Sequence, residues 1–432
     1  MKIAYITAGA GGMYCGSCLR DNTLAAALID AGHEVLLIPT YTPTRTDERN
    51  LSRKRVFLSG INIYLQQHFD LFRRTPGILD RLWELAPLLR LTTRWGVRVD
   101  PARLGRLTVS MLRGIDGFQR KEILKLVRFL AEEVKPDVVN LPNSLLISMA
   151  PAIKAALSVP VCCTLQGEEL FLDGLGEPYR SESMRLISRH AAYVDAFIAV
   201  SDFGARFMAS YLGIEQTRIH VAPLGINFDG YEEGRGAERE PFTIGYLARV
   251  APEKGLHILC EAYRCLRTNG NLPPSRLWAA GYLAPEHGSY FARIRKSLES
   301  SGLSESFLYH GELDRRGKLD FLRNLSVFSV PCTFDDPKGL FLLEAMASGV
   351  PVVQPRRGAF TEIVQTTGGG ILVEPDSPDD LARGILDLWR NPERRVEMGS
   401  RAHRGVREHY SAAGMAAKVL EIYQHETTDK RR

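Results

Sequence analysis

Two consecutive series of short apolar segments, each alternating with helical stretches, run through most of this sequence. Such alternation is typical of parallel sheets covered by helices, and 432 residues suffice for two domains of about 200 residues each. The sequence therefore predicts an α/β protein with two doubly wound domains in tandem. The predicted strands lie at 2–7, 33–38, 137–142, 159–165, 196–201 and 219–224 in the first series, and at 242–248, 276–281, 307–311, 327–332, 350–355 and 369–374 in the second.

A polar, glycine-bearing stretch at 227–241, NFDGYEEGRGAEREP, separates the two series and has little to bury, so we interpret it as a linker. The predicted N-terminal domain then covers 1–226 and the C-terminal domain covers 242–410. Within the first domain, the segment from about 45 to 130 is mostly helical and forms an insertion. A last helix within 411–432 could pack on either domain, including back on the first.

Composition excludes several classes of protein. The sequence is 45 % hydrophobic and 24 % charged, as in soluble globular proteins, and no apolar run approaches the roughly 18 residues of a membrane span. The start, MKIAYITAGAGG, lacks the apolar core of a signal peptide. Seven cysteines without a paired spacing pattern fit a reducing compartment. We expect a cytoplasmic protein with no nucleic-acid partner, and peripheral contact with the inner face of a membrane remains an option.

The first chemical signal is GYLARVAPEKGL at 245–256. A predicted strand ends at Ala248, and Arg249 and Lys254 flank a loop that leads into a helix. Two cations and a helix N-terminus at the carboxyl end of a strand suit a diphosphate. Two solvated charges on a loop are the alternative interpretation.

The second signal is DDPKGLFLLEAMASGVPVV at 335–353. A helix begins near Gly339, and its first amides can receive phosphate or sugar hydroxyls. Glu344 follows in an apolar surround, where a carboxylate needs hydrogen-bond partners such as a ribose diol. A glutamate that is merely favoured by the helix dipole is the alternative.

These motifs resemble the donor domain of retaining GT-B glycosyltransferases of family 4. The resemblance rests on ARVAPEKGL, on the Asp336-to-Glu344 spacing before EAMASGVPVV, and on GAFTEIV and GGGILVEPDSPDDLA further on, and it covers about 240–390. AGHEV, TLQGEEL, VSDFGARF and PLGIN match the N-terminal half more loosely, and VFLSGINIYLQQ at 56–67 resembles glycogen and starch synthases. The resemblance implies a GT-B fold, with two Rossmann-like domains facing a central cleft.

The resemblance also implies site residues. Arg249 and Lys254 would hold the donor diphosphate, Glu344 the ribose, and Asp336 the sugar ring. Backbone groups of Gly339, Leu340, Phe341 and Leu342 would complete the sugar and phosphate contacts, and the loop at Leu313 would meet the base. Such enzymes typically need neither cofactor nor metal, and the sequence has no D-x-D of the metal-dependent kind. Two residues depart from the family pattern: Asp336 replaces a usual Glu, and Gln166 in TLQG replaces a usual His at the sugar's outer hydroxyl.

The stretch at 8–22, AGAGGMYCGSCLRDN, combines a glycine loop with a Cys15-x-x-Cys18 pair. In the implied architecture this loop reaches over the cleft toward the donor phosphates, where Gly11 and Gly12 allow close backbone approach. A zinc site needs four ligands, and no second C-x-x-C or His pair completes one. We therefore interpret the glycines as functional and the cysteines as incidental, with redox sensitivity left open because a helix start can lower a thiol pKa. Glu168 and Glu169, just beyond Gln166, either face an acceptor hydroxyl or lie on a solvated loop.

The implied function is a retaining transfer of a hexose from a nucleotide sugar, UDP-linked by preference, to an unidentified saccharide, lipid or other hydroxyl compound. A GT-B sugar-nucleotide epimerase and a degenerate protein that only binds nucleotide sugars are the alternatives. Residues 71–130 hold thirteen Arg and Lys against five Asp and Glu, whereas the whole chain carries only +5. This basic segment, with Arg90, Arg94 and Arg98, is either a solvated helical cap or a surface for an anionic partner such as a membrane leaflet.

Overall fold

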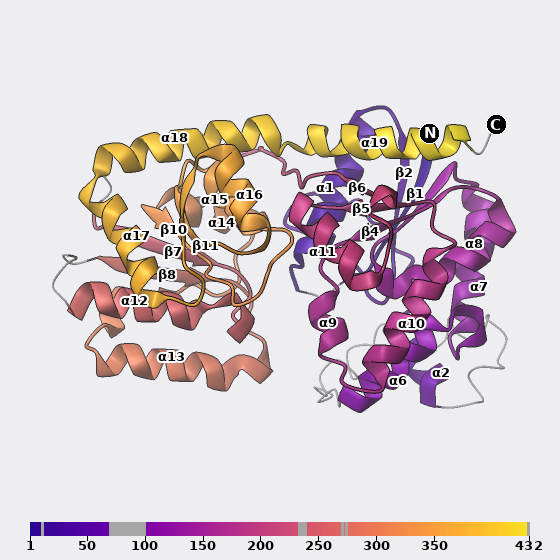
Figure 1. Cartoon of the computed structure of the whole chain (residues 1–432), viewed down its shortest axis with the longest axis horizontal. Helices are drawn as coiled ribbons and strands as arrows, with labels where there is room; N and C mark the ends of the chain where they lie inside the picture. The colour runs from indigo at the N-terminus through magenta and orange to yellow at the C-terminus, as the bar shows by residue number, and fades with distance from the viewer. Residues whose placement is uncertain (10–12, 69–100, 232–239, 269–271, 273–274, 430–432) are drawn as a thin grey trace. The chain divides into compact units, whose positions relative to one another are not determined.

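The computed structural model describes residues 1–9, 13–68, 101–231, 240–268, 272 and 275–429. The chain divides into two compact units (Figure 1). Unit 1 comprises Met1–Val200, Gly204–Ala222 and Ala416–Arg432, and unit 2 comprises Ser201–Phe203 and Pro223–Met415. Most of the last helix, α19 (Ala412–Asp429), therefore groups with the N-terminal part of the chain.

The sheet of unit 1 has six parallel strands in the order β2-β1-β3-β4-β5-β6. Each corresponds to a predicted strand, and most of their residues are buried, as expected for a parallel sheet covered on both faces. The strands are β1 (Lys2–Thr7), β2 (Glu34–Pro39), β3 (Val138–Leu141), β4 (Val161–Leu165), β5 (Ala196–Ala199) and β6 (Ile219–Val221).

The described helices of unit 1 include three from the predicted helical insertion. The predicted start near residue 45 is too early, because 45–59 runs beside β2 instead, with bridges from Leu37 to Ser52 and from Thr40 to the buried Phe57. Residues 69–100 of that insertion lie outside the described residues. The helices are α1 (Gly16–Asp30), α2 (Gly60–His68), α6 (Pro101–Leu112), α7 (Arg120–Phe129), α8 (Ala150–Leu157), α9 (Glu169–Asp173), α10 (Tyr179–Ala191) and α11 (Asp202–Leu212).

The sheet of unit 2 also has six parallel strands, in the order β12-β11-β10-β7-β8-β9, and again each was predicted. The strands are β7 (Thr243–Leu247), β8 (Arg276–Ala280), β9 (Phe307–Tyr309), β10 (Val327–Phe328), β11 (Val352–Pro355) and β12 (Gly370–Val373). The helices are α12 (Leu256–Thr268), α13 (Gly288–Ser300), α14 (Arg315–Arg323), α15 (Leu340–Ala347), α16 (Gly358–Thr367), α17 (Pro378–Arg390) and α18 (Pro392–His409). Helix α12 packs beside α17, whereas α15 and α16 pack beside α18 (Figure 1).

The strand order explains where each unit is suited to hold a ligand. In unit 2 the first strand, β7, lies between β8 and β10, so the chain reverses its direction of winding there. In unit 1 the corresponding switch lies between β1 and β3. Open α/β sheets bind ligands at the carboxyl ends of the strands that flank such a switch. The candidate residues that follow β7 and β10 are therefore brought to one edge of the sheet.

No helix in the described parts of the chain is both long enough and apolar enough to cross a membrane. Outside the gaps in the description, no group of three or more His, Cys, Asp and Glu side chains is arranged to hold a metal ion.

Candidate active site

The switch point of unit 2 brings together two predicted site residues that are far apart in the sequence. Lys254 ends a short 3-10 turn after β7, and Asp336 lies in the loop after β10. The Lys254 Nζ atom is 2.6 Å from Asp336 Oδ2. Asp336 Oδ1 accepts hydrogen bonds from the backbone amides of Lys338 at 2.9 Å and Gly339 at 3.2 Å. Asp336 thus fixes both the lysine and the turn that precedes α15.

The pair stays charged although both residues are largely buried. Burial alone would lower the pKa of Lys254, but the Asp336 carboxylate outweighs it and the pKa of the lysine is raised. Burial would likewise raise the pKa of Asp336, yet Lys254 and Lys338 hold it below its ordinary value. The ammonium also lies 4.7 Å from the ring centroid of Phe334 and 5.4 Å from that of Phe341. A fixed cation is therefore present where a strand ends.

The turn before α15 depends on a glycine. Gly339 has φ +64°, and a Cβ atom there would lie 2.8 Å from Ile363 Cδ1, so both conformation and space favour glycine. The helix bonds begin with the amides of Leu342 and Leu343, which donate to the Gly339 carbonyl at 2.9 and 3.3 Å. As at any helix start, the preceding amides, those of Leu340 and Phe341, have no carbonyl of the same helix to bind. They can receive an anionic oxygen.

Arg249 differs from Lys254 in its environment. Its side chain is 44 % exposed and forms an ion pair with Glu253, four residues along the chain. Sequence reasoning treated the two cations alike, but only Lys254 is built into the protein interior. Because the side chain of Arg249 is largely at the surface, it can turn toward a bound anion.

Glu344 is buried in α15 and has a partner that sequence reasoning missed. The Nζ atom of Lys318, from α14, lies 2.5 Å from Glu344 Oε1. A signal for this lysine exists in the sequence. Lys318 shares the apolar face of its helix with Phe321 and Leu322, at spacings of three and four residues, where an apolar side chain is expected.

The loop between β9 and α14 carries the residues predicted to meet a nucleobase. Leu313 is half-buried and is followed by Asp314, whose side chain caps α14 by accepting from the amide of Gly317 at 2.8 Å. His310 packs edge-on between Trp278, at 5.0 Å, and Phe321, at 5.3 Å, and burial lowers its pKa. The histidine therefore has a packing role in this loop.

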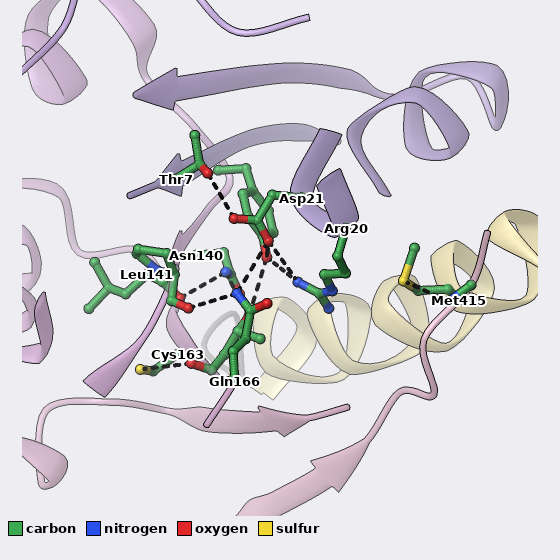
Figure 2. Close-up of polar contacts among 12 residues, drawn as sticks. Thr7, Arg20, Asp21, Asn140, Leu141, Cys163, Gln166 and Met415 are labelled. Atoms are coloured by element: carbon green, nitrogen blue, oxygen red, sulfur yellow. Dashed lines mark hydrogen bonds and ion pairs between the residues drawn. The ribbon is translucent and has the colours of Figure 1, made fainter. Parts of the chain in front are cut away.

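In unit 1, Gln166 follows β4 and is buried within a polar cluster (Figure 2). Its Nε2 atom donates to the Pro142 carbonyl at 3.0 Å and to Asp21 Oδ1 at 3.4 Å. Both neighbours are acceptors, so they fix the amide with its nitrogen toward them. Among the described residues, Gln166 Oε1 is buried and has no hydrogen-bond partner.

Asp21 is the centre of this cluster and was not predicted. Its carboxylate accepts from Thr7 Oγ1 at 2.8 Å and from the Tyr5 hydroxyl at 3.1 Å, and Arg20 Nη1 lies 3.3 Å away (Figure 2). Arg20 and Asp21 are almost fully buried. Burial raises the pKa of Asp21 despite these partners. An Arg-Asp dipeptide usually lies on a solvated helix face, so the sequence pattern did not indicate that this pair is buried.

Other predicted residues of unit 1 have different outcomes. Glu168 is buried and accepts from the amides of Ser144 at 3.0 Å and Gln166 at 3.1 Å, so it shapes the loop and is not on a solvated one. A hydrogen bond with Cys15, together with burial, raises the pKa of the Cys18 thiol, which is the opposite of the lowering expected at a helix start. Gly11 and Gly12 lie outside the described residues, as do Arg90, Arg94 and Arg98.

Two known protein families match this chain. The family described as "Glycosyltransferase Family 4" matches residues 22–229, and the family described as "Glycosyl transferases group 1" matches residues 229–405. Together the two matches span residues 22–405, which include the candidate residues after β7 and β10. The chain belongs to the GT-B glycosyltransferases of the family 4 type.

Two relatives and one solved structure illustrate the family. The lipopolysaccharide core biosynthesis mannosyltransferase LpcC of Rhizobium leguminosarum bv. viciae is 28 % identical over 56 % of this chain and 70 % of its own. The phosphatidyl-myo-inositol mannosyltransferase of Mycobacterium tuberculosis is 28 % identical over 52 % of this chain, and the match spans only 58 % of that relative. The crystal structure of Anabaena HepE in complex with UDP has a TM-score of 0.69 at 17 % identity, over 98 % of this chain and all of that one. The last comparison shows that the GT-B fold is shared.

Proposed function

We propose that this family 4 glycosyltransferase moves a hexose from a nucleotide sugar to an acceptor hydroxyl, with retention of anomeric configuration and without a metal ion. One observation carries the proposal. The buried ammonium of Lys254 is held by Asp336 beside the start of α15, at the carboxyl ends of β7 and β10. A fixed cation next to helix amides is suited to the charge that develops on a departing diphosphate.

Each candidate site residue of unit 2 then has a proposed role. Lys254, Arg249 and the first amides of α15 bind the diphosphate, and their positive charge replaces a metal ion. Glu344 binds the ribose. Asp336 positions Lys254 and the turn at Gly339 through three hydrogen bonds, and a carboxylate has about four acceptor directions, which leaves one for the sugar ring.

The proposed reaction is a displacement on one face of the sugar. The bond between the anomeric carbon and the diphosphate oxygen breaks, and the acceptor oxygen bonds to the same face. The acceptor proton passes to an oxygen of the leaving phosphate, so that no protein base is required. The protein contributes by holding the diphosphate and stabilising its charge. In unit 1, we propose that Gln166 Oε1 accepts from a ligand hydroxyl.

UDP is the nucleotide we propose, supported by the UDP complex of the structural neighbour HepE. The names of the two relatives make mannose a sugar to be tested beside glucose. Those names also concern a lipopolysaccharide core and phosphatidyl-myo-inositol, which supports an acceptor carried on a lipid or saccharide.

A described surface of unit 1 supports peripheral contact with an anionic membrane. Arg120, Leu124 and Arg128 are exposed and follow one another at spacings of four residues, so they share one face of α7. The exposed Ile115 and Phe118 lie in the segment that leads into this helix. Apolar and basic side chains combined on one surface are typical of proteins that rest on anionic bilayers. We propose that this surface, named here the 115–128 surface, brings the enzyme to a lipid-linked acceptor.

The activity is tested by incubating the purified protein with UDP-glucose, UDP-galactose, UDP-N-acetylglucosamine and GDP-mannose in EDTA, with and without lipid and saccharide acceptors. Nucleotide release is measured, and the anomeric configuration of the product is determined by proton NMR. The proposal expects acceptor-dependent release with retained configuration. Interconversion of the nucleotide sugar without an acceptor would instead show an epimerase, and binding without turnover would show a degenerate binding protein.

A further inference from the structure

Two charged side chains meet inside unit 2 at positions where the helix pattern favours apolar residues. Lys318 lies on the buried face of α14, and Glu344 lies on α15, in which every residue from Leu342 to Ala347 is buried. The two side chains are only 8 % and 12 % exposed. Each charge therefore has been removed from water, and they lie 2.5 Å apart.

The position of Lys318 is costly for stability. Its amide donates to the carbonyl of the capping residue Asp314 at 2.8 Å, so the lysine lies in the first turns of α14, where the helix dipole disfavours a cation. By contrast, the side chain of Arg316 on the same helix is 93 % exposed. Well-packed apolar residues often replace a buried ion pair without loss of stability. Stability alone therefore does not account for this pair.

The place of the pair relative to the proposed phosphate site suggests its use. Glu344 follows Leu340 by one helical turn, a rise of about 6 Å along α15. A nucleoside diphosphate whose phosphate meets the amides at the start of α15 would extend its ribose over such a distance. With Oε1 bound to Lys318, the second oxygen, Oε2, is the one that would bind a ribose hydroxyl.

We propose that Lys318 is a positioning and specificity residue for the nucleotide: it fixes the Glu344 side chain in one orientation and so makes the site select a ribose over a deoxyribose. This inference rests on the proposed function, because the ribose that Glu344 would bind belongs to the proposed nucleotide donor. Lys318 acts on the nucleotide through Glu344. An ionised carboxylate forms charge-assisted hydrogen bonds with hydroxyl donors, whereas a protonated one is a weaker acceptor. Without Lys318 the buried Glu344 loses its counter-charge and the contact that fixes its orientation.

The test compares the affinities of UDP, 2′-deoxy-UDP and 3′-deoxy-UDP, measured by calorimetry, with GDP and its deoxy analogues in parallel. The ratio of ribose to deoxyribose affinity cancels effects on the diphosphate. For the wild type we expect at least one deoxy analogue to bind about tenfold more weakly. For Lys318→Met we expect that ratio to fall below about threefold. Lys318→Arg should retain the ratio, and Arg316→Met, on the exposed face of α14, should match the wild type.

Two further results distinguish failure of this inference from misfolding of the variant and from failure of the proposed function. The double variant Lys318→Met with Glu344→Leu removes both charges, so it should stay folded and show a ratio near one even if Lys318→Met alone does not fold. A Lys318→Met protein, or failing that the double variant, that keeps the wild-type ratio would overturn the inference. If the wild type binds neither UDP nor GDP, the proposed function itself fails.

Discussion

Lys254 Nζ lies 2.6 Å from Asp336 Oδ2, although the two residues are 82 positions apart in the sequence and follow different strands. An ammonium has three hydrogen-bond donors, so this contact leaves others for a phosphate oxygen. The ion pair holds the cation in place before a ligand arrives, and a preorganised charge does not have to be reoriented during the reaction. The same pair joins the loops after β7 and β10 and therefore contributes to folding as well.

Lys254→Ala should lower kcat by about 100-fold or more and should also destabilise the protein, because the buried Asp336 carboxylate loses its partner. Removing one partner of a buried pair costs about 3–5 kcal/mol. Steady-state kinetics and urea denaturation measure the two effects. Unchanged stability would contradict the buried pair, and turnover within about threefold of the wild type would contradict the phosphate assignment.

Arg249→Ala should also lower kcat by about 100-fold but should leave the free energy of unfolding within about 0.5 kcal/mol of the wild type, since its side chain is 44 % exposed. Glu253→Ala is the matched control, because it removes the ion-pair partner and keeps the cation. A large fall in stability for Arg249→Ala would show that the arginine has a structural role.

Asp336→Asn should change the pH dependence of stability. The pKa of Asp336 is held below its ordinary value of 3.8, so its ionisation stabilises the fold above that pH, and this contribution is lost as pH falls through the lower folded value. The stability difference between wild type and Asp336→Asn should be constant from about pH 5 to 9 and should shrink below about pH 4. Denaturation at several pH values tests it, and a difference that grows in acid would contradict the pairing.

Asp21→Asn should both destabilise unit 1 and raise the KM for the donor. The substitution leaves the buried Arg20 without a carboxylate, at a cost of about 3–5 kcal/mol, and offers Gln166 Nε2 a possible donor instead of an acceptor. Asp30→Asn, exposed at the end of the same helix, is the control. Thermal unfolding and donor KM are the measurements. If Asp21→Asn has the stability and KM of the control, the cluster does not position Gln166.

Charge reversal on the 115–128 surface should remove membrane contact. The double variant Arg120→Glu with Arg128→Glu is expected to lose sedimentation with anionic vesicles, and wild-type binding should weaken as salt rises, because screening shortens the range of the attraction. Neutral vesicles are the control. Hydrolysis of the donor should be unaffected. Wild-type protein that ignores anionic vesicles would show that this surface is only solvated.

The strands of both sheets could be predicted because each is a short apolar run bounded by polar or glycine-containing segments. Arg249, Lys254 and Glu344 could be proposed as candidates from local motifs, and Asp336 from the family resemblance, because these residues follow β7 and β10 closely in the sequence. The start of α17 is also set by a local contact, since the Ser377 hydroxyl accepts a hydrogen bond from the amide of Asp380 and caps the helix.

Contacts between side chains far apart in the sequence could not be predicted from one sequence. Lys254 and Arg249 look alike in a motif, yet one is buried against Asp336 and the other is exposed. Lys318 and Asp21 lie on helices whose charged residues usually face water, and only tertiary packing turns them inward. Their partners come from other elements of the same unit, and neither periodicity nor spacing reports such contacts.

The most direct test of this account is a calorimetric titration of UDP and GDP in EDTA into wild type, Lys254→Met and Glu344→Gln. The account predicts that one nucleotide binds the wild type without metal, and that each substitution weakens it by about tenfold or more while circular dichroism stays native. Equal affinity in all three proteins, or no binding to the wild type, would contradict the assignment of the diphosphate and ribose site to the loops after β7 and β10.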